Sequence, residues 1–546
     1  MKKSNNTKYI FVCGGVLSGL GKGITTASIG LLLKNKGYKV TAVKIDPYIS
    51  LDAGTMRPQE HGEVFVTKDG GEIDQDLGNY ERFLHEDFTK DHNITTGKVY
   101  AQVIDNERHF VYQGRDAEII PDVIDEIKRR IYKISKGFDF VMVEVGGTVG
   151  DIENMPFLIA AREIGREFNS AYVMVTYLPF LRTIGELKTK PTQHAVMALR
   201  REGINPDFIV TRAEEPVDEP RLDNVSKRCF LDRDRVFDIP DQDSIYKVPD
   251  VLQKQGFVES ILEFFNEQGE DHSNMLITEW NKFVHSQSDE NVKVVRIGLV
   301  GKYVKHGAHA HKDTYISVFE ALKHACYPNN VRMEFEMIAS DDLTVNNYAE
   351  HLQSYDGIVV PQGWGARGME GKLLAIKYCR ENNVPYLGLC YGMQMAVIEF
   401  SRNVLGLTDA NSEEIAPDTG NPVIHLMEEQ KKHMKEGKFG GTIRLGNWPC
   451  ILVEGTRAKE IYEEAGIATP IQERHRHRYE YNIEYRERLE DAGLKVAGTS
   501  PDGLLVEMIE ITGHKFFIGT QAHPEYKSRP LQPHPLFVEF VKACTK

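Results

Sequence analysis

The chain has 546 residues. A single hydrophobic core stops growing at about 250–300 residues, so this length predicts two large domains. Lys and Arg total 66 against 80 for Asp and Glu, which gives a net charge of −14. A field of that sign repels a polyanion, so the charge balance argues against sequence-independent binding to nucleic acid.

The sequence carries no signal for export or for a membrane. The apolar run Tyr9–Cys13 is too short for the core of a signal peptide. No stretch approaches the roughly 18 apolar residues that a membrane span needs. The seven cysteines form no C-x-x-C pair, so neither a disulfide framework nor structural zinc is expected. A reducing cytoplasm is the predicted compartment.

The first half of the chain alternates strand-like and helix-like patterns. The apolar run Tyr9–Cys13 leads through a glycine-rich turn into Ile24–Asn35, whose apolar residues have helical spacing. Further buried strands are predicted at Val40–Ile45, Phe138–Val145, Ala171–Thr176 and Phe208–Val210. This alternation predicts an α/β domain over residues 1–270, in which helices cover both faces of a mainly parallel sheet.

A polar stretch separates this domain from a second one. Residues 271–292 are predicted to form the interdomain linker, partly helical around Met275–Trp280. The alternation then restarts, with strands predicted at Val294–Val300, Gly357–Val360, Tyr386–Leu389 and Phe516–Gly519. Residues 293–546 are therefore predicted to form a second α/β domain with a mainly parallel sheet, after a first domain that is P-loop-like or Rossmann-like.

The turn Gly14–Gly23 has the composition of a phosphate-binding loop. Its glycines let backbone N–H groups turn inward, the following helix start adds partial positive charge, and Lys22 adds a full one. Five residues separate Gly15 from Gly21, and a glycine stands where Ser or Thr is usual, so the match to a Walker A motif is loose. The alternative is a glycine-rich turn without a ligand.

Acidic and basic residues near other strand ends suggest the rest of a nucleotide site. Asp76 and Glu144 are candidate Mg²⁺ ligands, because Mg²⁺ prefers carboxylates and bridges triphosphate oxygens. A solvated or helix-capping acid is the alternative for each. The segment Lys188–Gln193 has two lysines and two hydroxyls that are suited to a second triphosphate, and its alternative is an exposed basic turn.

The sharpest local signal is a nucleophile elbow at Tyr386–Gln394. An apolar strand runs into G-x-C-x-G and then into an apolar helix, which projects Cys390 at a strained turn beside a backbone oxyanion donor. His523 and Glu525 supply a base and its orienting acid. The alternatives are a buried core thiol and a structural histidine. The other six cysteines are expected to be inert: Cys13, Cys229, Cys326, Cys379, Cys450 and Cys544.

Two further segments fit this site. Pro361–Gly365 is a glycine-rich loop after a strand and is the candidate source of a second oxyanion donor. Glu473–Arg478 is dense in hydrogen-bond donors, and one of its arginines is suited to the carboxylate of a substrate. The histidine spacing and the acidic total disfavour a metal or a nucleic acid there.

These residues resemble the CTP synthase family over nearly the whole chain. The match includes the nucleophile elbow and the His523–Glu525 pair. It also includes Gly14–Ile24, Lys44–Ile49, His61–Val66, Asp76–Phe83, Gly146–Glu153, Lys188–Gln193 and Asp243–Pro249. Motifs of this number and length, in this order, make chance similarity negligible.

The resemblance implies a division of chemistry between two domains. An N-terminal synthetase domain would use Mg-ATP to phosphorylate the uracil 4-oxygen of UTP. A C-terminal class I glutamine amidotransferase domain would release ammonia through a cysteine thioester, and ammonia would pass to the first site and displace phosphate to give CTP. The family also implies activation by GTP, inhibition by CTP, and homotetramers that sometimes form filaments.

The family's functional residues carry over by position. Contacts to ATP are expected from Ser18, Gly19, Leu20, Gly21, Lys22, Gly23, Ile24, Lys44 and Asp76. Contacts to UTP or CTP are expected from Ser18, Asp151, Ile152, Glu153, Lys188, Thr189, Lys190, Pro191, Thr192, Gln193 and Lys227. Glutamine would contact Gly363, Tyr391, Gln394, Glu414 and Arg478 around the catalytic Cys390, His523 and Glu525. Asp76 and Glu144 would bind Mg²⁺.

The chain departs from the family pattern at several positions. In Gly114–Asp122 the family's Gln and His are replaced by Glu118 and Asp122, in a segment that resembles the pyrimidine-nucleotide wall contributed by a neighbouring subunit. New acids beside a triphosphate should weaken its binding by like-charge repulsion. Three other positions differ: Gln362 replaces Gly, Trp364 replaces Phe, and Ala522 replaces an aromatic residue. The loop His306–His311 is longer than in the family and is interpreted as an exposed polar insertion, with metal binding by its histidines as the alternative.

Three hypotheses follow. The favoured one is a glutamine-hydrolysing CTP synthase. The second is a paralogue that aminates another oxo-pyrimidine nucleotide, which the altered segment Gly114–Asp122 suggests. The third is a catalytically reduced filament or regulatory subunit, against which the intact elbow, the His523–Glu525 pair and Lys22 argue.

Overall fold

The computed structural model describes residues 7–183, 185–269, 275–306, 309–310, 312–427, 430–432 and 441–546. Its internal contacts divide the chain into two compact units. The first comprises Met1–Asp52 and Asn79–Val284, and the second comprises Ala53–Gly78 and His285–Lys546. A segment from the N-terminal half of the sequence therefore packs with the C-terminal half. The sequence-based boundaries at residues 270 and 293 stay a prediction.

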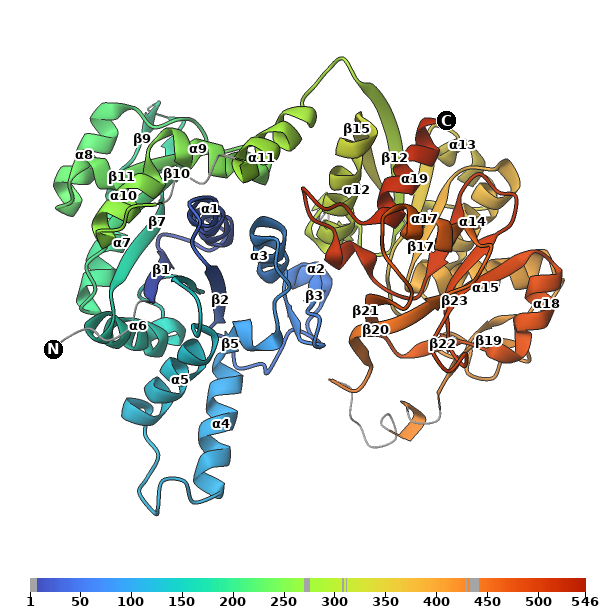
Figure 1. Cartoon of the computed structure of the whole chain (residues 1–546), viewed down its shortest axis with the longest axis horizontal. Coiled ribbons are helices and arrows are strands. Elements are labelled where there is room, and N and C mark those ends of the chain that lie inside the picture. The colour runs from blue at the N-terminus through green and yellow to red at the C-terminus, as the bar shows by residue number, and fades with distance from the viewer. Residues whose placement is uncertain are drawn as a thin grey trace. The chain divides into compact units, whose positions relative to one another are not determined.

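In the described part of the first unit, seven parallel strands form one sheet in the order β11-β10-β7-β1-β6-β2-β5 (Figure 1). The strands are β1 (Lys8–Gly14), β2 (Val40–Asp46), β5 (Asn93–Thr95), β6 (Phe140–Val145), β7 (Ser170–Tyr177), β10 (Phe208–Ala213) and β11 (Val236–Pro240). Every residue of β1, β2 and β6 is buried, as expected for strands covered on both faces.

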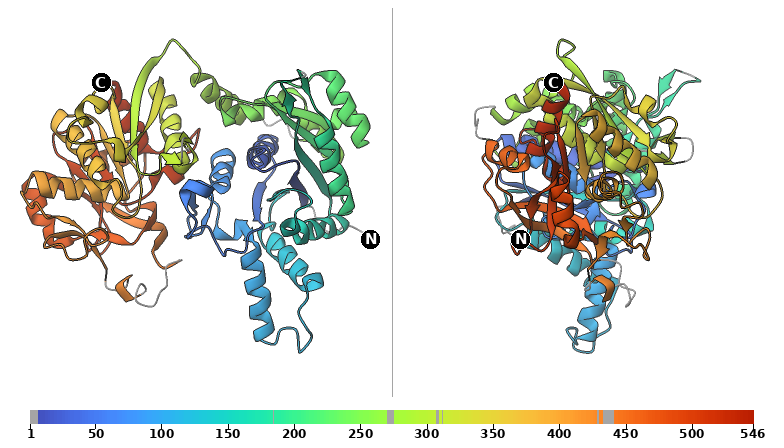
Figure 2. Two further views of the ribbon diagram at one scale, coloured as in Figure 1. Left: turned by 180° about the vertical axis from the view of Figure 1, so that it is seen from behind. Right: turned by 90° about the vertical axis from the view of Figure 1, so that its right-hand side faces the viewer.

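Helices cover the two faces of this sheet. One face packs against α4 (Thr96–Arg108), α5 (Ile124–Ile134), α6 (Met155–Glu167), α7 (Lys190–Arg201) and α8 (Glu219–Cys229) around one hydrophobic core. Helix α1 (Lys22–Asn35) packs with α9 (Val248–Lys254) and α10 (Phe257–Phe265). The far end of α4 and the loop after it project away from the sheet in all three views (Figures 1 and 2).

Part of the predicted linker is a packed helix. Helix α11 (Met275–Ser286) buries the indole of Trp280, which packs on Phe83 and Tyr246 and donates from Nε1 to the carbonyl of Tyr246 at 2.9 Å. The sequence stretch is polar overall, but its apolar residues recur at helical spacing and bury one face. Residues 271–274 of the predicted linker lie outside the described residues.

The described part of the second unit contains a nine-stranded sheet in the order β15-β12-β16-β17-β25-β24-β23-β20-β21. The parallel strands are β12 (Lys293–Gly301), β15 (Val331–Ala339), β16 (Gly357–Val360), β17 (Tyr386–Leu389) and β25 (Phe517–Thr520). The antiparallel strands are β20 (Arg444–Leu452), β21 (Ile471–His477), β23 (Leu494–Thr499) and β24 (Val506–Ile511).

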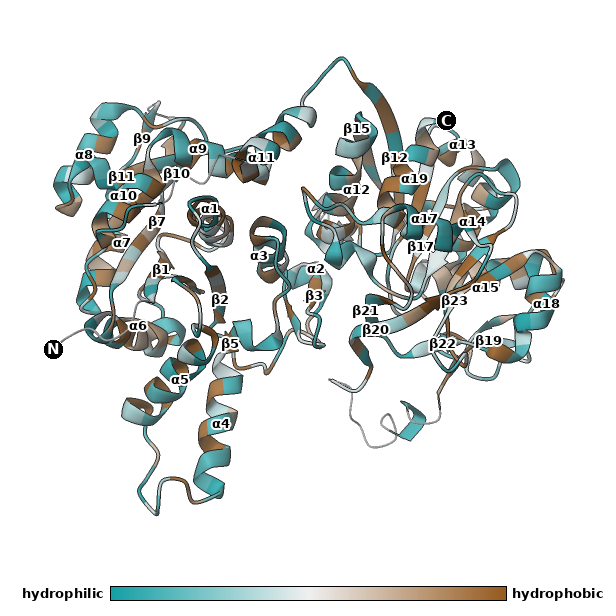
Figure 3. Ribbon diagram, viewed as in Figure 1, coloured by the Kyte–Doolittle hydropathy of each residue, from teal (hydrophilic) through white to brown (hydrophobic). Residues whose placement is uncertain are grey.

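Two hydrophobic cores flank this sheet. One includes α12 (Ile316–Asn329), α17 (Arg457–Glu464) and α19 (Pro535–Thr545). The other includes α14 (Met369–Asn382), α15 (Tyr391–Asn403) and α18 (Arg486–Asp491). Hydrophobic residues concentrate on the strands of both sheets, whereas α8 and α18 are mostly hydrophilic (Figure 3).

The segment Ala53–Gly78 adds a hairpin to the second unit. Strands β3 (Val64–Val66) and β4 (Glu72–Asp74) pair antiparallel, with Val64 opposite Asp74. The chain then enters α3 (Asp76–Leu84).

The start of the first helix and the loop at residues 306–311 can also be compared with their predictions. The first helix begins at Lys22, two residues earlier than predicted, because Gly21 takes the left-handed conformation before it. In the predicted loop His306–His311, the structure describes strands β13 (Lys305–His306) and β14 (His309–Ala310), whereas Gly307, Ala308 and His311 lie outside the described residues. Across the described residues, no helix is both long and apolar enough to cross a bilayer.

Candidate functional sites

Three of the predicted nucleotide-binding motifs follow neighbouring strands of the first sheet. Strand β1 pairs in parallel with both β6 and β7. The turn Gly14–Gly23 follows β1, the segment Gly146–Glu153 follows β6, and Lys188–Gln193 lies between β7 and the body of α7. Parallel strands end at one edge of a sheet, and ligands of open α/β sheets bind there. The structure thus brings these motifs to a common edge.

The glycine-rich turn has an open backbone and a fixed lysine. Gly19 and Gly21 adopt left-handed conformations, and the stretch Val16–Gly19 is exposed. The amine of Lys22 donates to the carbonyl of Gly147 at 3.0 Å. A Cβ atom on Gly14 would lie 2.6 Å from Cδ of Lys22, so only glycine leaves room for the lysine there. Exposed N–H groups before a helix start, beside a lysine, suit a phosphate.

A buried carboxylate lies deeper at the same edge. Glu144, the penultimate residue of β6, is 1% exposed and accepts a hydrogen bond from Lys44 Nζ at 3.0 Å and one from the hydroxyl of Tyr80. Lys44 Nζ also lies 3.7 Å from Asp46. The lysine balances the charge of Glu144 in a site with little water.

The donor set fits Mg²⁺ only if phosphate and water complete it. No group of three or more His, Cys, Asp or Glu side chains within the described ranges could hold a metal ion. Glu144 belongs to the first unit, and Asp76 is the half-buried first residue of α3 in the other unit's segment. Mg²⁺ commonly binds one or two carboxylates together with waters and substrate phosphates, so Glu144 alone is a suitable protein ligand, and a contribution from Asp76 stays a prediction.

The residues expected at the pyrimidine nucleotide differ in their surroundings. Lys190, Lys227, Ile152 and Glu153 are exposed, and Ile152 has 81% of its surface accessible. By contrast, Thr192 is fully buried, and its hydroxyl shares a 2.5 Å hydrogen bond with Thr176. That hydroxyl is already satisfied inside the fold.

Other residues expected at the pyrimidine nucleotide form hydrogen bonds or ion pairs with neighbouring groups. Asp151 accepts from the N–H of Thr148 at 3.1 Å, and Lys188 forms an ion pair with Glu186 at 2.8 Å. Gln193 donates to the hydroxyl of Thr189 at 3.2 Å, and half-buried Pro191 begins α7 with Lys190.

The altered segment Gly114–Asp122 pairs one of its new acids internally. Arg115 Nη1 donates to Asp122 at 2.8 Å, Arg115 Nη2 bonds the second carboxylate oxygen, and the N–H of Glu118 donates to Asp122 at 2.8 Å. The hydrogen bond from Arg115 lowers the pKa of Asp122 despite the opposing effect of desolvation. The charge of Asp122 is therefore balanced locally, whereas the side chain of Glu118 is exposed.

In the second unit, Cys390 stands at a strained turn between β17 and α15. Its φ of 50° and ψ of −101° are unusual for a residue with a side chain. A Cβ atom on Gly392 would lie 2.0 Å from the carbonyl oxygen of Val360, so the turn requires glycine there. The N–H of Cys390 donates to the carbonyl of Thr520 at 2.8 Å, which ties the elbow to β25. This is the geometry of a nucleophile elbow.

The predicted base reaches the elbow from that neighbouring strand. His523 follows β25, is 1% exposed, and bonds through Nδ1 to Glu525 Oε1 at 2.8 Å. Burial disfavours its charged form, but the nearby negative charge of Glu525 and the influence of Cys390 raise the pKa of His523 to about 10. The ring of Tyr526 stacks on the imidazole at 5.1 Å. Thiol, imidazole and carboxylate thus form one buried array.

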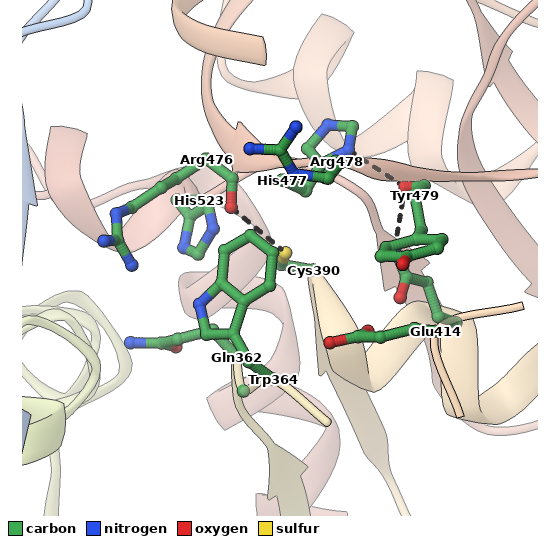
Figure 4. Close-up of a pocket in the computed structure, with 11 residues that line it drawn as sticks. Gln362, Trp364, Cys390, Glu414, Arg476, His477, Arg478, Tyr479 and His523 are labelled. Atoms are coloured by element: carbon green, nitrogen blue, oxygen red, sulfur yellow. Dashed lines mark hydrogen bonds between the residues drawn. The ribbon is translucent and has the colours of Figure 1, made fainter. Parts of the chain in front are cut away.

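A small cavity opens at this array. Figure 4 shows Cys390 between His523 on one side and Glu414 on the other. Its lining comprises Gln362, Gly363, Trp364, Cys390, Gln394, Glu414, Arg476, His477, Arg478, Tyr479 and His523. Four residues predicted to bind glutamine are among them. The fifth, Tyr391, is buried outside this lining and donates from its hydroxyl to the carbonyl of Gly365 at 2.8 Å.

Charged groups suited to an amino acid line the cavity. Glu414 accepts from the N–H of Gly365 at 2.6 Å, and burial raises the pKa of its carboxyl. Arg478 donates to Gln430 at 2.9 Å and to Thr442 at 3.1 Å. A carboxylate and a guanidinium at one cavity match the ammonium and carboxylate groups of a zwitterion.

Among three further residues of the lining, Tyr479 lies outside every segment that the sequence assigned to this site, and Arg476 and His477 lie in Glu473–Arg478 without individual roles. Arg476 and His477 come from β21, and Tyr479 follows them. Cys390 Sγ lies 3.8 Å from the carbonyl oxygen of Arg476. Burial, together with the charge of Arg444, lowers the pKa of His477 well below its usual value, so this ring is neutral.

The fold and the array together define a class I glutamine amidotransferase joined to a nucleotide-binding domain. A family model described as glutamine amidotransferase class-I matches residues 310–543, and one described as CTP synthase N-terminus matches residues 8–267. The chain belongs to the CTP synthase family.

Curated relatives resemble the chain over its full length. A CTP synthase of Carboxydothermus hydrogenoformans is 50% identical over 545 residues, with 99% of each chain covered. One of Methanocaldococcus jannaschii is 49% identical, with 98% of each chain covered. Among solved structures, the glutaminase domain of Trypanosoma brucei CTPS with bound acivicin is 36% identical, with a TM-score of 0.42. It covers 46% of this chain and 94% of its own.

Proposed function

We propose that this protein converts UTP to CTP, with ATP as the activating co-substrate and glutamine as the nitrogen donor. Membership of the CTP synthase family over the full length supports this proposal. The observation that carries it is the buried array of Cys390, His523 and Glu525 at a nucleophile elbow, in a chain whose other unit has a phosphate-type turn.

Glutamine hydrolysis would proceed through a thioester. The sulfur of Cys390 attacks the amide carbon of glutamine, and the N–H groups of Tyr391 and Gly363 would stabilise the developing oxyanion. The imidazolium of His523 donates its proton to the leaving nitrogen, so ammonia departs as the carbon–nitrogen bond breaks. Neutral His523 then takes a proton from water, which attacks the thioester and releases glutamate and the thiol.

The amination would take place at the edge of the first sheet. The γ-phosphoryl group of ATP passes to the 4-oxygen of UTP, ammonia attacks carbon 4, and phosphate leaves with the oxygen. The turn Ser18–Ile24 and Lys44 would hold the phosphates of ATP. Asp76 and Glu144 would hold Mg²⁺, which when bound would offset the negative charge of the triphosphate.

The pyrimidine nucleotide would lie beside ATP at the same edge. We assign it to Ser18, to Asp151–Glu153, to Lys188–Gln193 and to Lys227. Thr192 would act through its backbone, because its side-chain hydroxyl is used inside the fold. In the amidotransferase site we assign glutamine to Gly363, Tyr391, Gln394, Glu414 and Arg478.

Regulation and assembly are proposed from membership of the CTP synthase family. GTP would activate glutamine hydrolysis, CTP would inhibit, and the enzyme would act in the cytoplasm as a homotetramer that can form filaments. A surface feature supports assembly: the projecting arm of α4 and the loop after it exposes a group of large apolar side chains, Ile104, Phe110, Val111, Ile119 and Ile120. Exposed apolar groups of this kind mark protein interfaces.

One observation favours the second hypothesis, a paralogue that aminates another oxo-pyrimidine nucleotide. Exposed Glu118 adds a negative charge to the altered segment, which would disfavour a triphosphate. The second new acid, Asp122, is paired with Arg115, so its charge is balanced and does not add to this repulsion. UTP is therefore the better candidate acceptor than another oxo-pyrimidine nucleotide.

An acceptor screen tests the proposal. Purified protein receives ATP, Mg²⁺ and glutamine with UTP, dUTP or UDP as acceptor, and nucleotide products are separated by chromatography. We expect CTP from UTP at the highest kcat/KM. Turnover of another uracil nucleotide in preference to UTP would support the paralogue. Folded protein that aminates none of them, even when ammonia is supplied directly, would support the catalytically reduced subunit.

A further inference from the structure

The loop Pro361–Gly365 borders the cavity and is fastened mainly from within the C-terminal half of the chain. Lys302 Nζ donates to the carbonyls of residues 364 and 365. Glu414 accepts from the N–H of residue 365 at 2.6 Å, and Lys372 donates to the carbonyl of residue 361 at 2.9 Å. These bonds hold the two ends of the loop. The middle of the loop, where Gly363 would offer its N–H to an oxyanion, is held by a different contact.

That contact comes from the side chain of Gln362. Its Nε2 donates to Oε1 of Glu63 at 3.1 Å. The other carboxylate oxygen of Glu63 accepts from the N–H of Ser317, in the first turn of α12, at 3.0 Å. Glu63 is only 3% exposed, and hydrogen bonds to a buried carboxylate are stronger than those between neutral groups. One carboxylate therefore bridges a helix N-terminus and the middle of the loop.

Glu63 is a rigid anchor because the hairpin that follows it is itself docked. Tyr526, whose ring stacks on His523, donates from its hydroxyl to the carbonyl of Val64 at 3.0 Å. Arg474 donates to the carbonyl of Val66 at 3.0 Å. On the second strand, Glu72 accepts from Nε of Arg476 at 2.8 Å. All these residues belong to the second compact unit.

We propose that Gln362 is a positioning residue for glutamine hydrolysis, which holds Gly363 in place through its bond to Glu63; this rests on the proposed function. A glycine at position 362 has no side chain with which to make the bond. The anchor is carried by Ala53–Gly78, the segment that also contains Asp76, the first residue of α3. Glutamine hydrolysis therefore depends on a segment that the sequence places in the ATP-dependent half.

A charge-exchange experiment tests this contact. Gln362→Glu sets two carboxylates against each other, and kcat/KM for glutamine is expected to fall about tenfold or more, chiefly in kcat. The double variant Gln362→Glu with Glu63→Gln restores the bond with donor and acceptor exchanged. The new amide at position 63 donates to the new carboxylate and still accepts from Ser317. We expect it to recover glutamine-dependent CTP synthesis to within about threefold of the wild type.

The controls separate this inference from the proposed function. Gln353→Glu makes the same change at an exposed position of the same unit and should leave all rates unchanged. Wild-type protein without glutamine-dependent CTP synthesis would contradict the proposed function itself. If the wild type is active, a Gln362→Glu variant with normal kcat/KM, or a double variant no better than the single one, overturns the inference. If Gln362→Glu fails to fold, Gln362→Gly takes its place: a loss of about tenfold for glutamine supports the anchor, and no loss overturns it.

Discussion

At the scale of residues, the surroundings of each cysteine distinguish Cys390 from the other six. All seven are free and buried. Burial raises the pKa of Cys13 to about 12 and that of Cys229 to about 11, so these thiols stay protonated and are poor nucleophiles. Cys390 instead begins a helix and lies beside the imidazole of His523.

Replacement of the nucleophile should separate the two activities. Cys390→Ala is expected to abolish glutamine-dependent CTP synthesis and to retain synthesis from added ammonia, because only the thioester step uses the sulfur. Lys22→Ala is the matched counterpart: it should lose amination with either nitrogen source and keep some glutamine hydrolysis. Product assays with glutamine and with ammonium chloride measure both. Loss of the ammonia-dependent reaction in folded Cys390→Ala would contradict the two-site model.

The raised pKa of His523 predicts the pH dependence of glutamine hydrolysis. The folded value of about 10 lies above the ordinary 6.5, so the imidazolium persists through neutral pH and can protonate the leaving nitrogen. We expect kcat/KM to fall on the alkaline side as pH approaches about 10. Glu525→Gln removes the largest stabilising charge and should move this fall to lower pH. An alkaline fall centred near 6.5 in the wild type would count against the assignment.

The same group links stability to pH in a definite direction. Because its folded pKa is raised, the ionised imidazole stabilises the fold fully below pH 6.5 and loses this contribution as pH rises through about 10.

The sequence predicts the residues of the elbow better than those of the cavity around it. Cys390 lies in a local strand–turn–helix pattern, and His523 and Glu525 stand two residues apart after a strand. Arg476 and Tyr479 reach the cavity because β20 and β21 pair antiparallel, which no short pattern specifies.

At the scale of elements, buried parallel strands are the most predictable parts of the fold. Each is a short apolar run, and β1 and β6 appear where that pattern places them, apart from a residue or two at their ends. The hairpin β3–β4 is different. Its residues pack against Tyr526 and Arg474, hundreds of positions away, so its membership of the second unit depends on contacts that a local pattern does not contain.

Helix α11 gives a test of packing at this scale. Trp280 is fully buried against Phe83 and Tyr246, so Trp280→Ala should leave a cavity and cost about 3–5 kcal/mol of stability. Thermal unfolding followed by circular dichroism measures the effect. Phe230→Ala, at a position that is 82% exposed, is the matched control and should change little. An unchanged midpoint for Trp280→Ala would show that α11 does not contribute to the core.

At the scale of the whole molecule, length and alternating patterns predict two α/β sheets, and the structure has them. The assembly proposed for this protein would use apolar surface that the fold leaves exposed. The exposed apolar residues of the projecting arm are not needed for the core of the first sheet, and the family pattern suggests that a neighbouring subunit meets this segment.

A charge on the arm should therefore disrupt assembly. Phe110 is 68% exposed, and Phe110→Glu is expected to shift the protein towards smaller species without unfolding it. Size-exclusion chromatography with light scattering measures this shift over a range of protein concentrations. Phe230→Glu adds the same charge elsewhere on the first unit and should leave the mass unchanged. A tetramer that survives Phe110→Glu would place the interface elsewhere.

The excursion of Ala53–Gly78 limits how this protein could be divided by gene fission. A break in the gene near residue 285 would give a C-terminal product without the backbone carbonyls that hold Tyr526 and Arg474. Such a fragment, produced alone, is expected to hydrolyse glutamine more slowly than the intact chain and to recover when a peptide spanning 53–78 is added. The second unit therefore includes residues that lie within the first unit's stretch of sequence. A gene that encoded only residues after 285 would produce an amidotransferase unit without its Ala53–Gly78 segment.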